Sequence, residues 1–206
     1  ISLGGKKDVD KAVSAAKKAF ETWAFSKKEE RLELLEKLYV VYKKRWAEMA
    51  KLISTEMGAP MKFSTEMQAA TGASHIKSFK NILKDFKFEK DLGEEKNNQK
   101  LLYEPKGVCA LITPWNWPIN QVNLKVIPAL ASACTVVLKP SEVAPLSSML
   151  LAEMIDEVKF PAGVFNLVNG DGAITGDALT SHPDVDMISF TGSTRAGALI
   201  SQNAAK

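Results

Sequence analysis

The side chains best suited to chemistry follow four short apolar segments of the chain. After the first segment, residues 113–118 read Thr-Pro-Trp-Asn-Trp-Pro, and the two prolines restrict the backbone around Asn116 and exclude a helix there. A carboxamide held in one orientation can donate a hydrogen bond to an oxygen that gains negative charge during a reaction. A turn that carries two core tryptophans is an equally good interpretation of this composition.

Lys139, Ser141 and Glu142 follow the second apolar segment, in the sequence Lys-Pro-Ser-Glu. A lysine at the end of a strand can bind sugar or phosphate oxygens, and a glutamate shortly after it can accept hydrogen bonds from ribose hydroxyls. The pattern therefore fits a nucleotide site, although a solvated ion pair is the more common arrangement of such residues.

Glycine-rich segments follow the third and fourth apolar segments. Residues 169–176 approach the dinucleotide-binding fingerprint, with one extra residue before the last glycine. In residues 190–197, Gly192 and Ser193 stand before an expected helix, whose free N–H groups would face an anion such as pyrophosphate. Each segment also fits an ordinary strand-to-helix turn, the second one with a serine cap.

The four apolar segments position these residues, and they predict an α/β fold with a doubly wound, Rossmann-like parallel sheet. Short continuous apolar runs are typical of strands that are buried on both faces. Helical stretches lie between them, so the ligand is expected beyond the carboxyl ends of the strands. The predicted strands are residues 108–113, 135–138, 164–168 and 185–190, and the predicted helices are residues 124–133, 146–158 and 174–179.

Helical periodicity dominates the part of the chain that precedes the sheet. It predicts a helix over residues 9–23, a long helix that starts at a Ser26–Glu29 capping box and ends at Gly58, and a third helix over about residues 64–83. Charges of both signs alternate in residues 84–100, which indicates an exposed hairpin or excursion that is not part of the core.

The ends of the chain indicate a fragment of a longer protein. The chain begins without methionine, and the predicted helix of residues 194–206 has no glycine or proline that would end it.

Charge and hydropathy exclude several classes of partner. The 206 residues hold 27 Lys and Arg against 24 Asp and Glu, and a net charge of +3 is too small for binding nucleic acid through its phosphates unless the charge clusters on one face. No apolar run approaches the ~20 residues that span a bilayer, and the N-terminus lacks a secretory signal. We therefore expect a cytoplasmic protein with neither nucleic acid nor membrane as a partner.

The cysteines and histidines predict neither a disulfide framework nor a metal site. Cys109 and Cys134 are expected to be small buried residues, without a cation or base that would lower the pKa of either thiol. His75 and His182 each stand alone, as expected of surface or capping histidines.

Taken together, the four strand-end segments resemble the NAD(P)-dependent aldehyde dehydrogenase superfamily. The residues that carry the resemblance are TPWNWP at 113–118, KPSE at 139–142, PAGVFNLVNGDG at 161–172 and FTGSTRAG at 190–197. The resemblance implies N-terminal helices of a cofactor-binding domain in residues 1–86 and strands of an oligomerisation domain in residues 87–105. Residues 106–206 would form the Rossmann-like cofactor-binding domain, incomplete at its C-terminus, and the complete protein would be a homodimer or homotetramer.

The resemblance also implies a role for each site residue. Asn116 would be the amide that stabilises the oxyanion. A carboxylate at Glu142 would repel a 2′-phosphate, so NAD is the expected cofactor and NADP the alternative. The implied cofactor-binding residues are Thr113, Trp115, Lys139, Ser141, Glu142, Gly172, Phe190, Gly192 and Ser193, and the implied residues of the aldehyde tunnel are Trp117, Ile119 and Gln121.

The implied reaction is the oxidation of an aldehyde to a carboxylic acid with NAD(P)+, through a thiohemiacetal and a thioester on a cysteine. In the family this cysteine and the water-activating glutamate lie downstream of the segment that ends at Lys206, and neither Cys109 nor Cys134 is in such a motif. The chain alone is therefore expected to be inactive. The alternatives are a catalytically silent NAD-binding fragment and a relative that transfers its acyl group to coenzyme A or phosphate.

Overall fold

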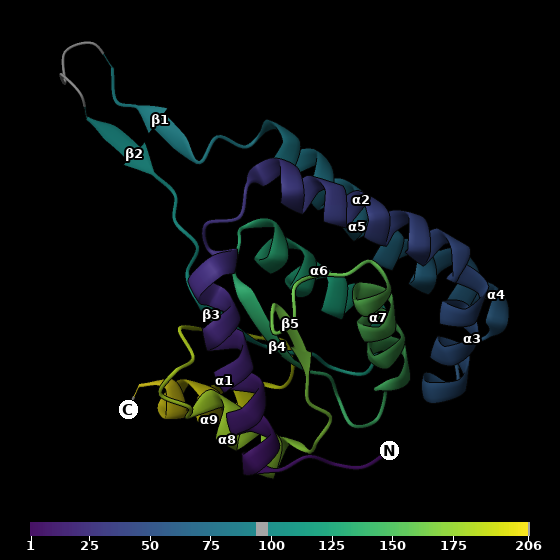
Figure 1. Ribbon diagram of the computed structural model, residues 1–206. Helices are drawn as coiled ribbons and strands as arrows, with labels where there is room; N and C mark the ends of the chain where they lie inside the picture. Colours follow the sequence, from purple (N-terminus) through teal and green to yellow (C-terminus); the bar gives the residue numbers. More distant parts are fainter. Residues whose placement is uncertain (94–98, 206) are drawn as a thin grey trace.

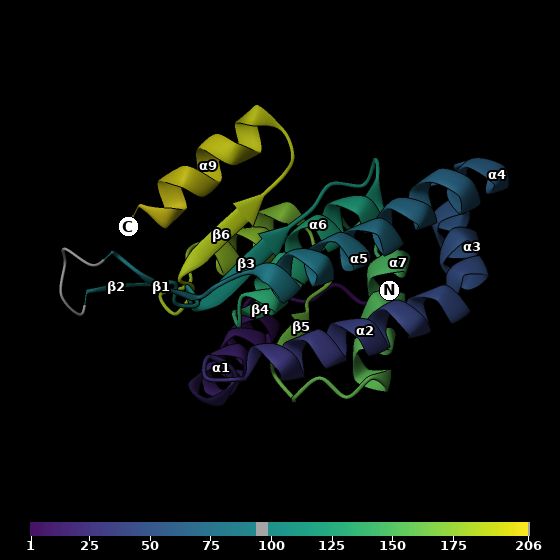
Figure 2. The same cartoon turned by 90° about the horizontal axis from the view of Figure 1, so that it is seen from above.

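A parallel sheet of four strands lies at the centre of the computed structural model, which describes residues 1–93 and 99–205. The strands are β3 (Val108–Ile112), β4 (Thr135–Lys139), β5 (Phe165–Leu167) and β6 (Met187–Phe190), in the spatial order β5-β4-β3-β6. Figure 2 shows β6 on the opposite side of β3 from β4 and β5. From β3 the chain adds β4 and β5 on one side and then returns to add β6 on the other side. This reversal of strand order is the one predicted for a doubly wound sheet.

Helices cover both faces of the sheet because successive side chains of each strand point to opposite faces. On one face, Val108, Ala110 and Ile112 of β3 pack in an apolar cluster with α1 (Lys6–Trp23), and this cluster also includes residues of α8 (Asp177–Thr180) and α9 (Thr194–Ala204). On the other face, Cys109 and Leu111 join the larger core with α6 (Pro118–Ala131) and α7 (Leu146–Glu157).

A further layer of helices packs outside α6 and α7 (Figure 1). It consists of α2 (Lys28–Lys44), α3 (Trp46–Met57) and α5 (Ala69–Asp85), with α4 (Met61–Phe63) and a π-helical turn (Ser64–Gln68) before α5. Gly72 lets the layers approach, because a Cβ there would lie 3.0 Å from Cγ1 of Ile119 and 3.1 Å from Cζ of Tyr42. The Tyr42 hydroxyl donates to the carbonyl of Ala69 at 2.9 Å, which satisfies a buried polar group.

Two details of the predicted helices are wrong. The single long helix is divided at Arg45, whose φ of −97° and ψ of 17° end α2, and whose guanidinium bonds Glu48 and Glu153 at 2.7 Å. The capping box is absent, because Ser26 accepts hydrogen bonds from the buried Arg31 and Lys27 is the N-cap residue of α2. The third helix and the left-handed Gly58 at the end of α3 (φ 73°) are confirmed.

The helix after the first strand begins earlier than predicted. Residues 124–133 were expected to be helical, whereas α6 begins at Pro118. Proline is favoured at the first position of a helix, because its missing N–H would have no partner there and its φ is already helical.

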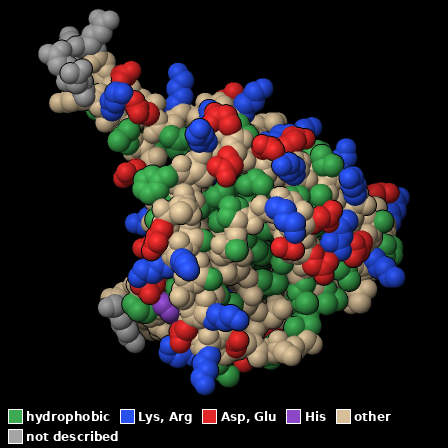
Figure 3. Space-filling view, in the orientation of Figure 1, with side chains coloured by type: hydrophobic (Ala, Val, Ile, Leu, Met, Phe, Trp, Pro, Cys, Tyr) green, Lys and Arg blue, Asp and Glu red, His purple; other side chains and the backbone are tan. Residues whose placement is uncertain are grey.

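The charged segment before β3 forms the predicted exposed hairpin. Strands β1 (Glu89–Asp91) and β2 (Lys100–Leu102) pair in an antiparallel ribbon that projects from the molecule (Figure 1), while residues 94–98 of the predicted hairpin lie outside the described residues. Rings of Phe86, Phe88 and Tyr103 pack at its base, and the Arg31 guanidinium lies 5.1 Å from the ring centre of Phe88. Figure 3 shows basic and acidic side chains interspersed over one face of the protein.

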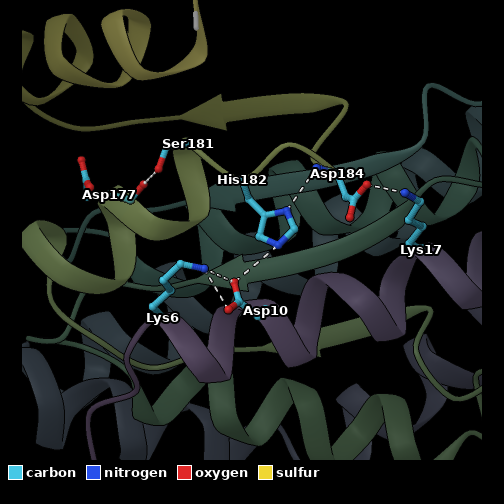
Figure 4. Close-up of polar contacts among 7 residues, drawn as sticks. All are labelled: Lys6, Asp10, Lys17, Asp177, Ser181, His182 and Asp184. Carbon is cyan, nitrogen blue, oxygen red and sulfur yellow. Dashed lines mark hydrogen bonds and ion pairs between the residues drawn. The ribbon is translucent and has the colours of Figure 1, made fainter.

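His182 belongs to a polar cluster that joins α1 to the loop before β6 (Figure 4). Its Nδ1 accepts the N–H of Asp184 at 3.1 Å, and its Nε2 lies 3.5 Å from Asp10. Lys17, which is on α1 like Asp10, forms an ion pair with Asp184, and this ion pair lowers the pKa of Asp184. These contacts support the predicted structural role of His182. In the described part of the chain, no three Cys, His, Asp or Glu residues are grouped as metal ligands, and no helix has the length and apolarity of a membrane span.

Glu56 caps α7, and burial of its carboxylate makes its contribution to the free energy of unfolding depend on pH. Its carboxylate accepts the N–H groups of Leu146 and Ser147, while burial raises its pKa above the usual value. Between the unfolded and folded pKa values the folded state binds more protons, so the stability contributed by Glu56 falls as pH rises through this window. Relative to Glu56→Gln, which does not titrate, wild type should therefore lose about 1 kcal/mol or less between pH 4 and pH 7. Urea unfolding of both proteins at several pH values measures the difference, and a constant or rising difference would contradict the assignment.

Candidate functional site

The four parallel strands end at one edge of the sheet, and a cavity of about 470 Å³ opens there. Ile112 at the end of β3 and residues of α8 and α9 contribute to its wall. Four of the residues that the sequence predicted for cofactor binding line it together, namely Lys139, Gly172, Phe190 and Ser193. They come from different strand-end segments, so the strand-to-helix connections converge on this cavity as expected for a ligand site.

Lys139 places a buried ammonium group beside the cavity. Only 3% of the residue is exposed, and Nζ donates to the carbonyls of Gly170 at 2.6 Å and Pro140 at 3.0 Å. The Glu142 carboxylate lies 3.4 Å from Nζ. Burial lowers the pKa of Lys139, and the charge of Glu142 opposes this shift. The ammonium is thus fixed by backbone carbonyls, with Glu142 as its most distant partner.

Ser193 is the N-cap residue of α9 and lies at the cavity, where the first turn of the helix has free backbone N–H groups. Its Oγ accepts the N–H of Ala196 at 3.2 Å, and its carbonyl accepts the N–H of Gly197 at 3.0 Å. Within the described residues, the N–H groups of Thr194 and Arg195 have no backbone partner. The start of a helix of this length favours an anion, because these donors and the helix dipole both carry positive charge.

Arg195 also lines the cavity, and sequence reasoning missed its side chain. Arg195 lies within the motif at 190–197, in which Phe190, Gly192 and Ser193 were the predicted cofactor-binding residues. Its position two residues after Ser193 could have identified it from the sequence, since side chains in the first turn of a helix surround a ligand that binds at that helix end.

Gly172 and Gly192, which were both predicted to bind the cofactor, have different surroundings in the structure. A Cβ at Gly172 would meet no atom within 4 Å, so this position is open to the cavity. A Cβ at Gly192 would lie 2.8 Å from Cε2 of Phe190, so packing of the Phe190 ring already requires a glycine there. Gly172 therefore affects access to the cavity, whereas Gly192 supports the ring that lines it.

Thr113 and Trp115 lie after β3 at the same sheet edge, outside the lining of this cavity. Thr113 is 3% exposed, and its Oγ1 is buried without a hydrogen-bond partner among the described residues. A buried hydroxyl without a partner is costly, and this atom is not alone in that respect, since the hydroxyl of Thr135 is also buried without a partner. Trp115 is 51% exposed and leaves a large aromatic surface free beside it.

Asn116 is exposed in the loop between β3 and α6, and it does not line the 470 Å³ cavity. Its carboxamide makes no hydrogen bond within the described part of the chain. The structure therefore brings Lys139 and Ser193 into one cavity and leaves Asn116 on the adjoining loop. The prolines exclude a helix at Asn116 as predicted, but no contact from these residues fixes the orientation of its side chain.

Ser141 and Glu142 lie at the start of the connection from β4 to α7. The Ser141 hydroxyl accepts the N–H of Val143 at 3.3 Å, which stabilises the turn. Glu142 borders a separate cavity of about 310 Å³, which Glu56 also lines, and it reaches the first cavity only through Lys139.

The predicted tunnel residues lie in and beside the first turn of α6. Trp117 is half-buried, with its Nε1 donating to Oγ1 of Thr71 at 3.0 Å and its ring edge-on to Phe63. Gln121 is half-buried. Ile119 is fully buried in the core, so its surroundings are those of a packing residue. A tunnel role for these three residues stays a prediction.

Comparisons with known proteins identify relatives over the whole chain. The family model described as "Aldehyde dehydrogenase family" matches residues 1–206. A 3-succinoylsemialdehyde-pyridine dehydrogenase from a Pseudomonas species is 52% identical over 206 residues, which is 100% of this chain and 42% of that protein. The chain therefore spans less than half the length of this relative.

Solved structures of similar proteins have the same fold. The crystal structure of an aldehyde dehydrogenase from Bartonella henselae matches with a TM-score of 0.96 and 58% identity, over 100% of this chain and 43% of that one. A mutant of aldehyde dehydrogenase C from Pseudomonas syringae, in complex with NAD+ and octanal, matches with a TM-score of 0.95 and 46% identity, over 99% of this chain and 41% of that one.

Proposed function

The chain belongs to the aldehyde dehydrogenase family, and from this premise we propose that it serves the NAD(P)+-dependent oxidation of an aldehyde to a carboxylic acid. Within these 206 residues the proposal assigns cofactor binding and oxyanion stabilisation. The nucleophilic cysteine and the water-activating glutamate of this reaction are assigned to a region outside them. The observation that carries the proposal is the convergence of Lys139, Gly172, Phe190 and Ser193 on one cavity.

The proposed cofactor is NAD, which supplies the hydride acceptor of the reaction. Lys139 and Glu142 bind the adenosine ribose, with Glu142 accepting from its hydroxyls and disfavouring a 2′-phosphate. The first turn of α9 binds the pyrophosphate through its free N–H groups, and the Arg195 guanidinium adds a cation beside it. The buried Oγ1 of Thr113 faces the nicotinamide side, where Trp115 shields the ring. The remaining contacts of the proposal are made by Ser141, Gly172, Phe190 and Gly192.

The proposed substrate is a small-molecule aldehyde that approaches along α6. Asn116 donates from its carboxamide to the carbonyl oxygen as negative charge develops there, and its exposed position leaves the amide free to do so. Trp117 and Gln121 line the approach, with Ile119 supporting them from the core. The β1–β2 ribbon contributes exposed edge strands to a homodimer or homotetramer. The free cysteines suit a cytoplasmic location.

A silent cofactor-binding module is the second candidate function. One specific observation favours it, because four predicted cofactor-binding residues of this chain, Lys139, Gly172, Phe190 and Ser193, line the 470 Å³ cavity together. A protein of this kind would bind the dinucleotide without oxidising an aldehyde. A relative that transfers its acyl group to coenzyme A or phosphate would use the same cofactor cavity.

Replacing Gly172 with leucine should block cofactor binding without unfolding the protein. A Cβ at position 172 would meet no atom within 4 Å, and Gly172 lines the cavity, so we expect a leucine there to reduce the space available to a ligand. We expect the affinity for NAD+ to fall at least about tenfold, or roughly 1.4 kcal/mol, at an unchanged melting temperature. Titration of tryptophan fluorescence with NAD+ and with NADP+ measures both the loss and the preference. Equal NAD+ affinity of variant and wild type, or tighter binding of NADP+ by wild type, would overturn the site.

A further inference from the structure

The loop that carries Asn116 is tied to α5 at the residue directly after it. Trp117 is half-buried, and its Nε1 donates to the hydroxyl of Thr71 at 3.0 Å. The Thr71 hydroxyl gives its own proton to the carbonyl of Gln68 at 2.8 Å, so its oxygen is available to the indole as an acceptor. Two hydrogen bonds in series therefore join the Trp117 side chain to the backbone at the start of α5.

An aromatic contact from the same part of the chain restricts the plane of the indole. The rings of Phe63 and Trp117 meet edge to face, with their centres 5.4 Å apart and their planes at 71°. Phe63 is the last residue of α4, and Thr71 lies in the first turn of α5. The indole is thus held at its nitrogen by a hydroxyl and across its ring by a phenyl group, so few side-chain rotations remain open to it.

The backbone of Trp117 is restricted as well. Trp117 is the N-cap residue of α6, with a φ of −148° and a ψ of 68°, and its carbonyl accepts the N–H of Gln121 at 3.1 Å. Pro118 disfavours a helical conformation of the residue before it. Asn116 is one peptide bond away, and its own side chain is exposed. The position of the Asn116 carboxamide therefore depends on how firmly Trp117 is held.

We propose that Thr71 is a positioning residue of the reaction, which holds Trp117 so that the Asn116 carboxamide meets the carbonyl oxygen of the aldehyde. The inference rests on the oxyanion role of Asn116 in the proposed function. In this role Thr71 contacts neither the aldehyde nor the cofactor, and it acts through Trp117 on Asn116. A displacement of about 1 Å at a reacting group can cost as much as about 10²-fold in rate. Loss of the Thr71 hydroxyl should cost less, because the loosened loop still visits the productive position.

Nuclear magnetic resonance of the ¹⁵N-labelled chain tests the contact itself. The chain has four tryptophans, and Trp117→Phe identifies which indole N–H signal belongs to Trp117. Thr71→Val keeps the shape of the side chain without the hydroxyl, so this proton should move upfield and exchange with water at least about twofold faster. Thr71→Ser keeps the acceptor and should leave the signal in place. An unchanged Trp117 signal in Thr71→Val would overturn the proposal.

Turnover in a catalytically active form of the protein tests the positioning role. Thr71→Val should lower kcat and kcat/KM for the aldehyde by the same factor, about 5- to 20-fold, because the hydrogen bond from Asn116 strengthens only in the transition state. The affinity for NAD+ should be unchanged, and Thr71→Ser should restore most of the turnover. Thermal melts verify folding, and Thr71→Ala, which removes the same hydroxyl with a better helix former, provides a second measurement. A loss confined to KM would overturn the role.

Asn120→Ala is the matched control for the link between α5 and α6. Asn120 Oδ1 lies 2.8 Å from Nε2 of His75, so this variant cuts a neighbouring hydrogen bond between the same two helices without touching Trp117. It should keep most of its turnover. A loss as large as that of Thr71→Val would show that any weakening of the helix contact slows the reaction, which would refute a specific role of Thr71.

A double variant distinguishes failure of this inference from failure of the proposed function. Because Thr71 acts through Asn116, adding Thr71→Val to Asn116→Ala should change turnover by less than about twofold. If the two losses multiply instead, the positioning role is refuted while the oxyanion role of Asn116 stands. If Asn116→Ala alone keeps full turnover, the oxyanion role itself fails, and the positioning role fails with it.

Discussion

Gly107→Ala should lower the free energy of unfolding by about 2–5 kcal/mol, because it combines backbone strain of about 1–3 kcal/mol with damage to a partly buried hydrogen bond of the Asp186 carboxylate, worth about 1–2 kcal/mol. Gly107 has a φ of +127°, which alanine adopts only with strain. A Cβ there would also lie 2.5 Å from the carboxylate carbon of Asp186. That carboxylate accepts the N–H of Val108 at 2.8 Å and so joins the start of β3 to the approach of β6.

Urea unfolding of the purified protein measures this loss, and the chain offers a matched control. Gly58 also has a positive φ, +73°, but a Cβ there would meet no atom within 4 Å. Gly58→Ala should therefore cost only about 1 kcal/mol from backbone strain. Equal losses at the two positions would show that contact with Asp186 contributes nothing.

Asn116→Ala should reduce turnover by about 10²–10³ in a catalytically active form of the protein, equivalent to roughly 2.7–4 kcal/mol of transition-state stabilisation. The physical reason is that an amide donor is neutral and independent of pH, and that it would stabilise negative charge that develops on the carbonyl oxygen only during the reaction. Because Asn116 does not line the 470 Å³ cavity, the affinity for NAD+ should be unchanged. Formation of NADH from an aldehyde measures turnover, and fluorescence titration measures binding.

Asn120→Ala provides the control for Asn116→Ala. Asn120 is an amide on the same segment, but its Oδ1 lies 2.8 Å from Nε2 of His75, so its side chain has a structural partner. We expect this variant to keep most of its turnover. A similar loss in both variants would indicate a general disturbance of the loop, and full turnover of Asn116→Ala would remove the oxyanion role.

Local pattern predicted β3 and β4 because their apolar residues are buried on both faces. It also located β5 and β6, although Asn166 and Ser189 interrupt their apolar residues and both strands are only partly buried, contrary to the expectation of burial on both faces. The missed features depend on contacts between residues far apart in the sequence. The break at Arg45 is accompanied by an ion pair with Glu153 of α7, and the N-terminus of α2 is altered because Arg31 also bonds the carbonyl of Ala131. No periodicity within either helix carries that information.

In the candidate site, too, local sequence predicted some features, whereas others depend on contacts between distant residues. Strand-end glycines, hydroxyls and Lys139 were predictable, since parallel strands end at one edge and the residues after them must surround it. The placement of Cys109 and Cys134 as diagonal neighbours on one face of the sheet was not, because it depends on which strands are neighbours and on their register. Likewise, the separation of Asn116 from the cavity follows from the path of the loop into α6, which the two prolines restrict without specifying.

The contacts of Lys139 have a consequence for the thermodynamics of ligand binding. Its three N–H donors already have acceptors in Gly170, Pro140 and Glu142. A ligand oxygen must therefore substitute for one of them, and Glu142 at 3.4 Å is the acceptor most easily displaced. Such an exchange conserves the number of hydrogen bonds, so its net enthalpy is small. Lys139 is accordingly suited to select a ligand by shape, with the gain in affinity coming from elsewhere in the cavity.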